Sequence, residues 1–197
     1  MIALIMAGGR GKRMKITKEK LLLRYNKPLI SHVVEALQKS NCFSRIIAAT
    51  SIHSKQTRLL LSRSHIEILD TPGHGYVLDL NSILKSLNDY IFIISGDMPL
   101  IDKQIIEKII GLHNTNNVWT SYLVTKNFVT EFQISYSKTI TFQNQECILT
   151  GLSIVNSNKI KDLSHIVETY IILNDRRIAV NINTLEDYQS LLPTTLP

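Results

Sequence analysis

Residues 2–14 read IALIMAGGRGKRM, a short apolar run that leads directly into a basic turn with three glycines. The apolar run predicts a strand that is buried on both faces. The glycines would let the backbone approach a bound phosphate closely, and the cations among them favour an anionic ligand. A solvated basic loop between a strand and a helix is the alternative interpretation.

The net positive charge of the chain is concentrated around this turn. Residues 1–30 hold eight lysines and arginines against one glutamate, whereas the other 167 residues hold fourteen cations and fifteen anions. Surfaces that bind nucleic acid or membranes more often spread their cations over helices and place aromatic residues among them. We therefore expect the cations to face a phosphate-bearing small molecule, with neither nucleic acid nor a membrane as a partner.

Length and composition indicate a single globular domain over residues 1–197. Apolar residues make up 44% of the chain and charged residues 19%, a balance typical of a folded domain. The apolar runs are all shorter than the roughly 20 residues of a membrane span. The first run is also too short for a secretion signal, and its cations follow it, so we expect a cytoplasmic protein.

Apolar runs alternate with amphipathic segments along most of the chain. We expect strands at 2–6, 45–50, 65–69, 90–95 and 118–124, and helices at 28–40, 54–62, 76–87 and 102–112. This alternation predicts an α/β fold with a mostly parallel sheet and helices on both faces. Ligands of such sheets bind beyond the carboxyl ends of the strands, so the loops after 2–6 and 90–95 should open onto one crevice.

The pattern changes after residue 125. Residues 131–145, EFQISYSKTITFQNQ, alternate polar and apolar side chains, which predicts a small antiparallel insertion with a turn at residues 137–138. This insertion could overhang the crevice. Strands are expected again at 169–174 and 177–182, before a last helix that begins with a capping box formed by Thr184 and Asp187.

Three phosphate-binding patterns are candidates for the glycine turn. The dinucleotide pattern G-x-G-x-x-G fails at Met14, and the P-loop pattern fails at both Met6 and Arg13. The pattern G-G-x-G-x-R-M, which nucleotidyltransferases use, fits residues 8–14 throughout. Arg13 would then supply a planar fork for phosphate oxygens. The alternative is a plain turn from a strand to a helix.

Three further stretches carry candidate binding groups. SGDMPLI places Asp97 after an apolar strand, where a carboxylate suits Mg²⁺, although a simple turn aspartate is the alternative. In DTPGHGYVLDL, residues 70–80, Tyr76 or His74 could touch a base or sugar, or the stretch could be a flexible turn. VNINT places Asn181 and Asn183 on one side of an expected strand. Their side chains would either contact a ligand or form hydrogen bonds at the end of the strand.

In order and spacing, MAGGRGKRM, SGDMPLI and NINTLEDY resemble the MobA-like nucleotidyltransferases over nearly the whole chain. The resemblance implies a Rossmann-like fold, transfer of a nucleotide to a phosphate, release of pyrophosphate and a requirement for Mg²⁺. Within that family, DTPGHGYVLDLN and TGLSIVNS are most similar to the archaeal guanylyltransferases, for which GTP is the donor and adenosylcobinamide phosphate the acceptor. GMP transfer to molybdopterin, nucleotide transfer to another small phosphorylated acceptor, and a non-catalytic nucleotide-binding module are the alternatives.

The same resemblance implies roles for individual residues. Catalysis would depend on Arg13, Lys20 and Asp97, with Lys20 on a phosphate and Asp97 as the metal ligand. The nucleotide would be bound by Ala7, Gly8, Gly9, Gly11, Lys12, Arg13, Lys20, Gly75, Tyr76 and Asp79. The acceptor would be bound by Gly151, Asn181 and Asn183.

Overall fold

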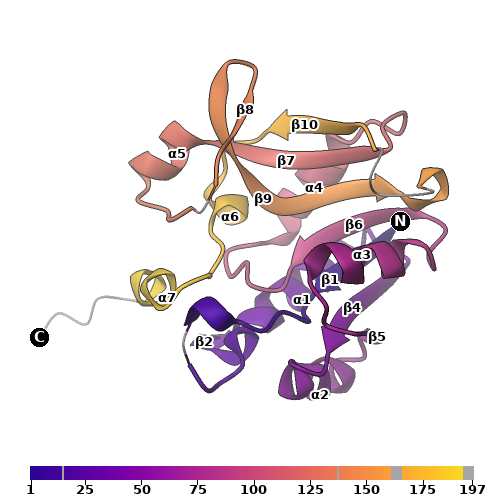
Figure 1. The fold of residues 1–197 in the computed structure, drawn as a ribbon, viewed down its shortest axis with the longest axis vertical. Helices are drawn as coiled ribbons and strands as arrows, with labels where there is room; N and C mark the ends of the chain where they lie inside the picture. The colour runs from indigo at the N-terminus through magenta and orange to yellow at the C-terminus, as the bar shows by residue number, and fades with distance from the viewer. Residues whose placement is uncertain (15, 137, 161–165, 193–197) are drawn as a thin grey trace, which may run out of the picture.

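The computed structural model describes residues 1–14, 16–136, 138–160 and 166–192, and is built around an eight-stranded sheet (Figure 1). The strand order is β10-β7-β9-β6-β1-β4-β5, with β8 paired to β9. The strands are β1 Ile2–Met6, β4 Arg45–Ser51, β5 Glu67–Thr71, β6 Tyr90–Ser95, β7 Trp119–Thr125, β8 Ile140–Phe142, β9 Gln145–Asn156 and β10 Glu168–Ile172. Two short strands, β2 Arg24–Tyr25 and β3 Lys27–Pro28, pair separately.

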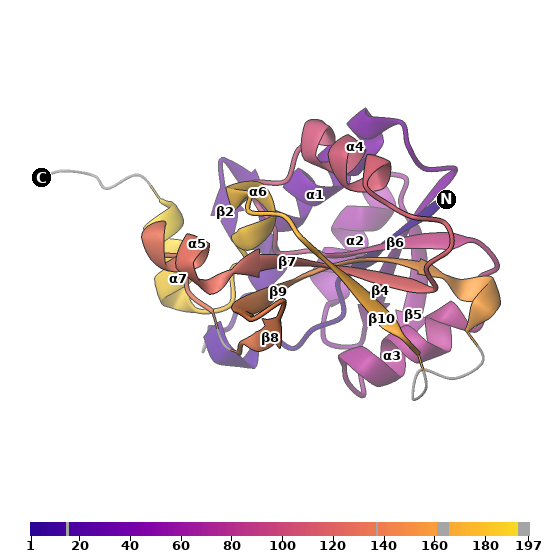
Figure 2. The same ribbon diagram turned by 90° about the horizontal axis from the view of Figure 1, so that it is seen from above.

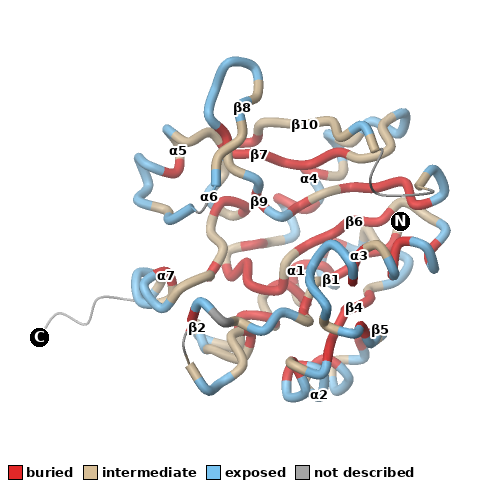
Figure 3. Tube along the Cα trace, viewed as in Figure 1, coloured by how far each residue is buried: buried red, intermediate tan, exposed pale blue. Residues whose placement is uncertain are grey.

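The sheet is mostly parallel, as predicted. β1 lies between β4 and β6 and is parallel to both, and β4 is parallel to β5. The exception is β9, which lies antiparallel between β6 and β7. The central strands are buried along most of their length, whereas the tip of the β8–β9 hairpin is exposed (Figure 3). The carboxyl ends of β1, β4, β5 and β6 therefore meet at one edge, as the crevice requires.

Helices cover both faces of the sheet (Figure 2). The helices are α1 Leu29–Ser40, α2 Lys55–Arg63, α3 Tyr76–Leu84, α4 Lys103–Gly111, α5 Lys126–Glu131, α6 Arg176–Ala179 and α7 Leu185–Leu191. α1, α2 and α4 share an apolar cluster with Ala3 and Ile5, whereas α3 packs on the opposite face against Ile2 and Leu4. Alternate residues of β1 therefore pack into two separate apolar cores, one on each face of the sheet. None of the helices in the described ranges has the length and apolar character needed to cross a membrane.

The antiparallel insertion forms, but its turn lies later than residues 137–138. The hairpin of β8 and β9 turns at Gln143 and Asn144, whose φ angles are 49° and 58°. Two successive positive φ angles are typical of the tight two-residue turns that suit twisted strands. Residue 137 lies outside the described residues.

The prediction of a strand at residues 177–182 is wrong. The side chain of Asp175 accepts a hydrogen bond from the Arg177 backbone N–H at 2.9 Å, and this cap begins the single-turn helix α6. The chain then crosses the carboxyl end of β6, where the backbone N–H of Ile182 donates to the Asp97 carbonyl at 3.1 Å. Residues 180–184 are thus held by a loop contact and not by a strand pairing, which brings Asn183 near Asp97.

Candidate active site

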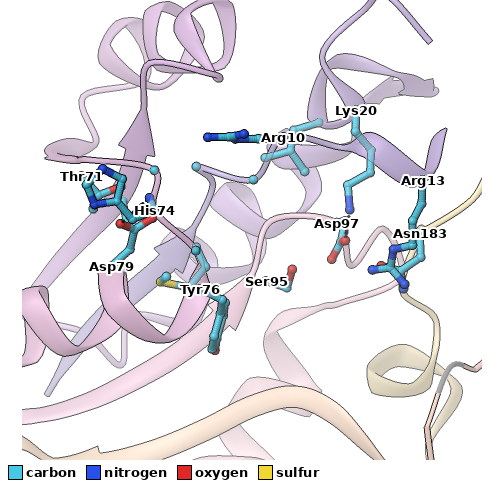
Figure 4. A pocket seen from close by; sticks show the side chains of 17 residues that line it. Arg10, Arg13, Lys20, Thr71, His74, Tyr76, Asp79, Ser95, Asp97 and Asn183 are labelled. Carbon is cyan, nitrogen blue, oxygen red and sulfur yellow. Dashed lines mark hydrogen bonds and ion pairs between the residues drawn. The ribbon is translucent and has the colours of Figure 1, made fainter. Parts of the chain in front are cut away.

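A cleft of about 530 Å³ opens where the carboxyl ends of β1, β5 and β6 meet (Figure 4). The glycine turn after β1 forms one wall, and the segment before α3 forms another. The cleft is lined by Gly8, Gly9, Arg13, Lys20, Gly75, Tyr76, Asp79, Asp97 and Asn183 among the residues singled out from the sequence. These residues come from four stretches far apart in the chain, and the sheet topology brings them together.

The glycine turn is anchored to β4. The Gly8 carbonyl accepts a hydrogen bond from the Ser51 hydroxyl at 2.7 Å, and a Cβ added at Gly8 would lie only 3.3 Å from the Ser51 Cβ. Gly11 has a φ of 58°, a conformation that glycine adopts without strain. Ala7 is buried, and its N–H donates to the Ala49 carbonyl at 2.9 Å. The start of the turn is therefore fixed to β4 at Ala7 and Gly8, and Gly8 and Gly9 line the cleft.

Asp97 lies at the base of the cleft with a side chain that is 6% exposed. Its Oδ2 forms an ion pair with Lys20 Nζ. Its Oδ1 is buried and has no hydrogen-bond partner within the described chain. A buried carboxylate oxygen without a partner is costly, so this atom is suited to bind a ligand that supplies positive charge.

The donor set at Asp97 fits a magnesium ion that is shared with phosphates. Among the described residues, no group of three His, Cys, Asp or Glu side chains could hold a metal by itself. Mg²⁺ in phosphate-binding sites usually takes one or two carboxylates, with substrate phosphates and water completing the octahedron. The single unpaired oxygen of Asp97 meets that requirement.

Arg13 links the glycine turn to the carboxyl-terminal segment. Its Nη2 donates to the Asn183 Oδ1 at 2.8 Å, although 170 positions separate the two residues. The backbone N–H of Asn183 in turn donates to Asp187 Oδ2 at 2.7 Å, within the capping box of α7. The expected capping box is thus confirmed, and it fixes Asn183 opposite the exposed guanidinium of Arg13.

Ion pairs hold the segment that precedes Asn183. Arg177 contacts Asp175 at 2.6 Å and Asp102, the N-cap of α4, at 3.1 Å. Hydrogen bonds from Arg177 lower the pKa of the Asp175 carboxyl. Because the folded pKa is depressed, this stabilisation is present at neutral pH and is lost only as the pH falls through that lowered pKa.

The segment before α3 forms part of the rim of the cleft, and the carboxylate of Asp79 is bonded within this segment. Asp79 Oδ1 accepts from the His74 backbone N–H at 3.3 Å, so this largely buried carboxylate shapes the turn. Gly75 precedes the helix with a φ of 129°, and Tyr76 is 52% exposed at the edge of the cleft. Tyr76 also lines a smaller hollow with Trp119 and Glu168.

A family model for the MobA-like NTP transferase domain matches residues 3–140 of the chain. The chain belongs to this family. The match includes the glycine turn, Lys20 and Asp97, and ends before the segment that carries Asn183.

The relatives of this MobA-like protein include two archaeal proteins. It is 33% identical over 115 residues to the adenosylcobinamide-phosphate guanylyltransferase of Methanocaldococcus jannaschii, covering 56% of this chain and 58% of that protein. It is 32% identical over 117 residues to a probable molybdenum cofactor guanylyltransferase of Pyrococcus horikoshii, covering 59% and 58%. The alignments thus span less than two thirds of both relatives.

The fold of this MobA-like protein is shared with solved nucleotidyltransferase structures. The CTP:phosphocholine cytidylyltransferase of Streptococcus pneumoniae superposes with a TM-score of 0.69, covering 96% of this chain and 97% of that chain. Sequence identity in that superposition is 15%. The likeness confirms the Rossmann-like nucleotidyltransferase fold with its antiparallel segment.

Several predicted site residues of the MobA-like protein lie outside the cleft. Asn181 donates to the Thr150 carbonyl at 3.1 Å and lines a separate cavity of about 380 Å³ beside α7. Gly151, in β9, is exposed and its φ is 81°. The expectation that Asn181 and Asn183 share one side of a strand is wrong because no strand forms there. Ala7 and Gly11 do not line the cleft, and the side chain of Lys12 lies outside the described part of the chain.

Only part of the amino-terminal basic charge faces the cleft. Of the six cations in residues 1–30 whose side chains the structure describes, three line it, namely Arg10, Arg13 and Lys20. Lys18 and Arg24 instead line a hollow against α2, and Lys27 forms an ion pair with Glu35 at 2.6 Å. The view that all of these cations serve one phosphate site is therefore too broad.

Three polar residues that line the cleft, Arg10, Thr71 and Ser95, were not among the candidates from the sequence. Arg10 lies between two glycines of the glycine pattern, and this position could have identified it as a phosphate-binding candidate. Thr71 and Ser95 are the last residues of β5 and β6. Since parallel strands present their carboxyl ends to the ligand, the final residue of each predicted strand could have been added to the candidates.

Proposed function

We propose that this protein transfers GMP from GTP to adenosylcobinamide phosphate and releases pyrophosphate. The observation that carries the proposal is the cleft itself, where the glycine turn and three cations face one buried carboxylate that has an unpaired oxygen. Guanine as the base and adenosylcobinamide phosphate as the acceptor are inferred from the likeness to the Methanocaldococcus enzyme.

In this proposal the glycine turn and Arg13 bind the triphosphate. Backbone N–H groups near Gly8 and Gly9 would point at phosphate oxygens, and the guanidinium of Arg13 would bind two of them at once. Held this way, the α-phosphorus faces the acceptor, and positioning of the two reactants supplies much of the rate.

Asp97 would hold Mg²⁺ through Oδ1 together with phosphate oxygens. The ion, when bound, offsets the negative charge that builds up on the leaving pyrophosphate. Lys20 and Arg10 line the same cleft and would add positive charge beside the phosphates.

The acceptor phosphate is the nucleophile and needs no strong general base. Its second pKa is about 6, so it is largely dianionic at neutral pH. One of its oxygens forms a bond to the α-phosphorus while the bond between that phosphorus and the bridging oxygen breaks, and pyrophosphate leaves in line. Asn183, fixed by Arg13 and by the cap of α7, lies at the cleft wall where it could orient the acceptor.

Molybdopterin is the second candidate acceptor because the Pyrococcus relative aligns with nearly the same identity and coverage.

One assay distinguishes the two candidate acceptors. Pyrophosphate release is followed with Mg²⁺ and each of GTP, ATP, CTP and UTP, with adenosylcobinamide phosphate, molybdopterin or phosphocholine. We expect release only with GTP, and at least tenfold faster with adenosylcobinamide phosphate. Faster release with molybdopterin would reassign the acceptor, and no release with any pair would favour a non-catalytic nucleotide-binding module.

A further inference from the structure

The two charged residues assigned to different ligands, Lys20 and Asp97, form an ion pair with each other. Lys20 is expected on a phosphate and Asp97 on a metal ion, yet Lys20 Nζ contacts Asp97 Oδ2 directly. Both side chains are well shielded, with 18% of Lys20 and 6% of Asp97 exposed. A metal ion on Asp97 and a phosphate on Lys20 would each compete with this ion pair.

The ion pair opposes binding of a metal ion to Asp97. A divalent cation on Oδ1 would share one carboxylate with the Lys20 ammonium group, and like charges at that separation repel strongly where water is scarce. The cleft already holds Arg10 and Arg13, so the cation would enter a region with an excess of positive charge.

Of the two partners, Lys20 is the one free to move. The Asp97 backbone is fixed by the hydrogen bond from the Ile182 N–H. The backbone beside Lys20 is fixed as well, because the Glu19 carboxylate accepts from the N–H groups of Gln56 and Thr57 at 2.8 Å each. The flexible four-carbon side chain of Lys20 can nevertheless turn toward another anion in the same cleft.

We propose that Lys20 keeps Asp97 from binding a divalent cation until a triphosphate offers Lys20 another anion. Metal ion and nucleotide then enter together, and the free protein does not collect metal ions at its active site. This inference rests on the nucleotide and metal site of the proposed function, and is independent of the acceptor.

The test measures Mn²⁺ binding to the nucleotide-free protein from the loss of the room-temperature EPR signal of free Mn²⁺. Replacing Lys20 with methionine removes the ammonium group and keeps an unbranched side chain. We expect Lys20→Met to lower the Kd for Mn²⁺ at least tenfold relative to wild type, although the same variant should transfer nucleotide more slowly. Thermal melting checks that the variant is folded, and Lys20→Gln replaces it if it is not.

Two controls separate this role of Lys20 from the general charge of the cleft. Arg13→Met removes an equal charge from the same cleft, but one that is bonded to Asn183 and not to Asp97, so the general loss of positive charge should raise its Mn²⁺ affinity by no more than about twofold. The double variant Lys20→Met/Asp97→Asn should lose the whole gain. An unchanged Kd in Lys20→Met, or an equal gain in Arg13→Met, would overturn the proposal. Because the assay contains neither nucleotide nor acceptor, that result would leave the transferase assignment standing.

Discussion

Replacing Asp97 with asparagine is expected to lower turnover by a factor on the order of 10² or more. The substitution keeps the size of the side chain and one oxygen but removes the negative charge at the base of the cleft. A carboxylate that holds the metal ion contributes most when charge develops on the leaving pyrophosphate, so the loss should appear in kcat. The rate of pyrophosphate release from GTP with adenosylcobinamide phosphate, at saturating Mg²⁺, measures it.

A matched control for this substitution is Glu67→Gln. Glu67 is an exposed carboxylate that pairs with Arg45 at the amino-terminal ends of β5 and β4, at the opposite edge of the sheet from the cleft. The same change from acid to amide there should leave turnover within about twofold of wild type. If Asp97→Asn also turned over at a near-normal rate, Asp97 would be a turn residue with no metal role, because asparagine is equally suited to turns.

Replacing Phe92 with alanine is expected to reduce the free energy of unfolding by about 3–5 kcal/mol, the range for a large aromatic side chain removed from a core. Phe92 is fully buried in β6, the strand that leads to Asp97, and its ring centroid lies 5.3 Å from that of Phe43. The cavity could not collapse easily because neighbouring strands fix the backbone on both sides. Urea denaturation followed by circular dichroism measures the change.

The control for Phe92→Ala is Leu59→Ala, a substitution on α2 at a side chain that is 49% exposed. Truncation there should cost about 0.5 kcal/mol, as is usual for surface positions. Equal losses at the two positions would mean that β6 is not packed at the centre of the core as described.

The parallel half of the sheet could be predicted from the sequence because its strands are apolar on both faces. The runs at 2–6, 45–50 and 90–95 each lie within one residue of β1, β4 and β6. The placement of β9 between β6 and β7 could not be predicted, since it depends on pairings between residues far apart in the chain. The segment 177–182 misled the prediction because its apolar residues are buried in the single-turn helix α6 and in the loop after it, which crosses the sheet edge.

The parts of the site that come directly after strands could be predicted from the sequence. Asp97 and the glycine turn both come directly after buried strands, and parallel packing then places them in one cleft. The ion pair of Lys20 with Asp97 and the contact of Arg13 with Asn183 could not be foreseen. They depend on the path of loops whose positions are set by tertiary hydrogen bonds, such as the one from Ile182 to the Asp97 carbonyl.

The central claim is that the cleft transfers GMP to a phosphate, and labelled GTP tests it most directly. The protein is incubated with Mg²⁺, adenosylcobinamide phosphate and GTP that carries ³²P at either the α- or the γ-position, and the products are separated by chromatography. We predict that the α-label moves to the cobinamide product and that the γ-label appears in pyrophosphate, with neither transfer detectable in Asp97→Asn over the same period. Release of the γ-label as inorganic phosphate, with no α-label on the acceptor, would show hydrolysis instead of nucleotide transfer and would contradict the account.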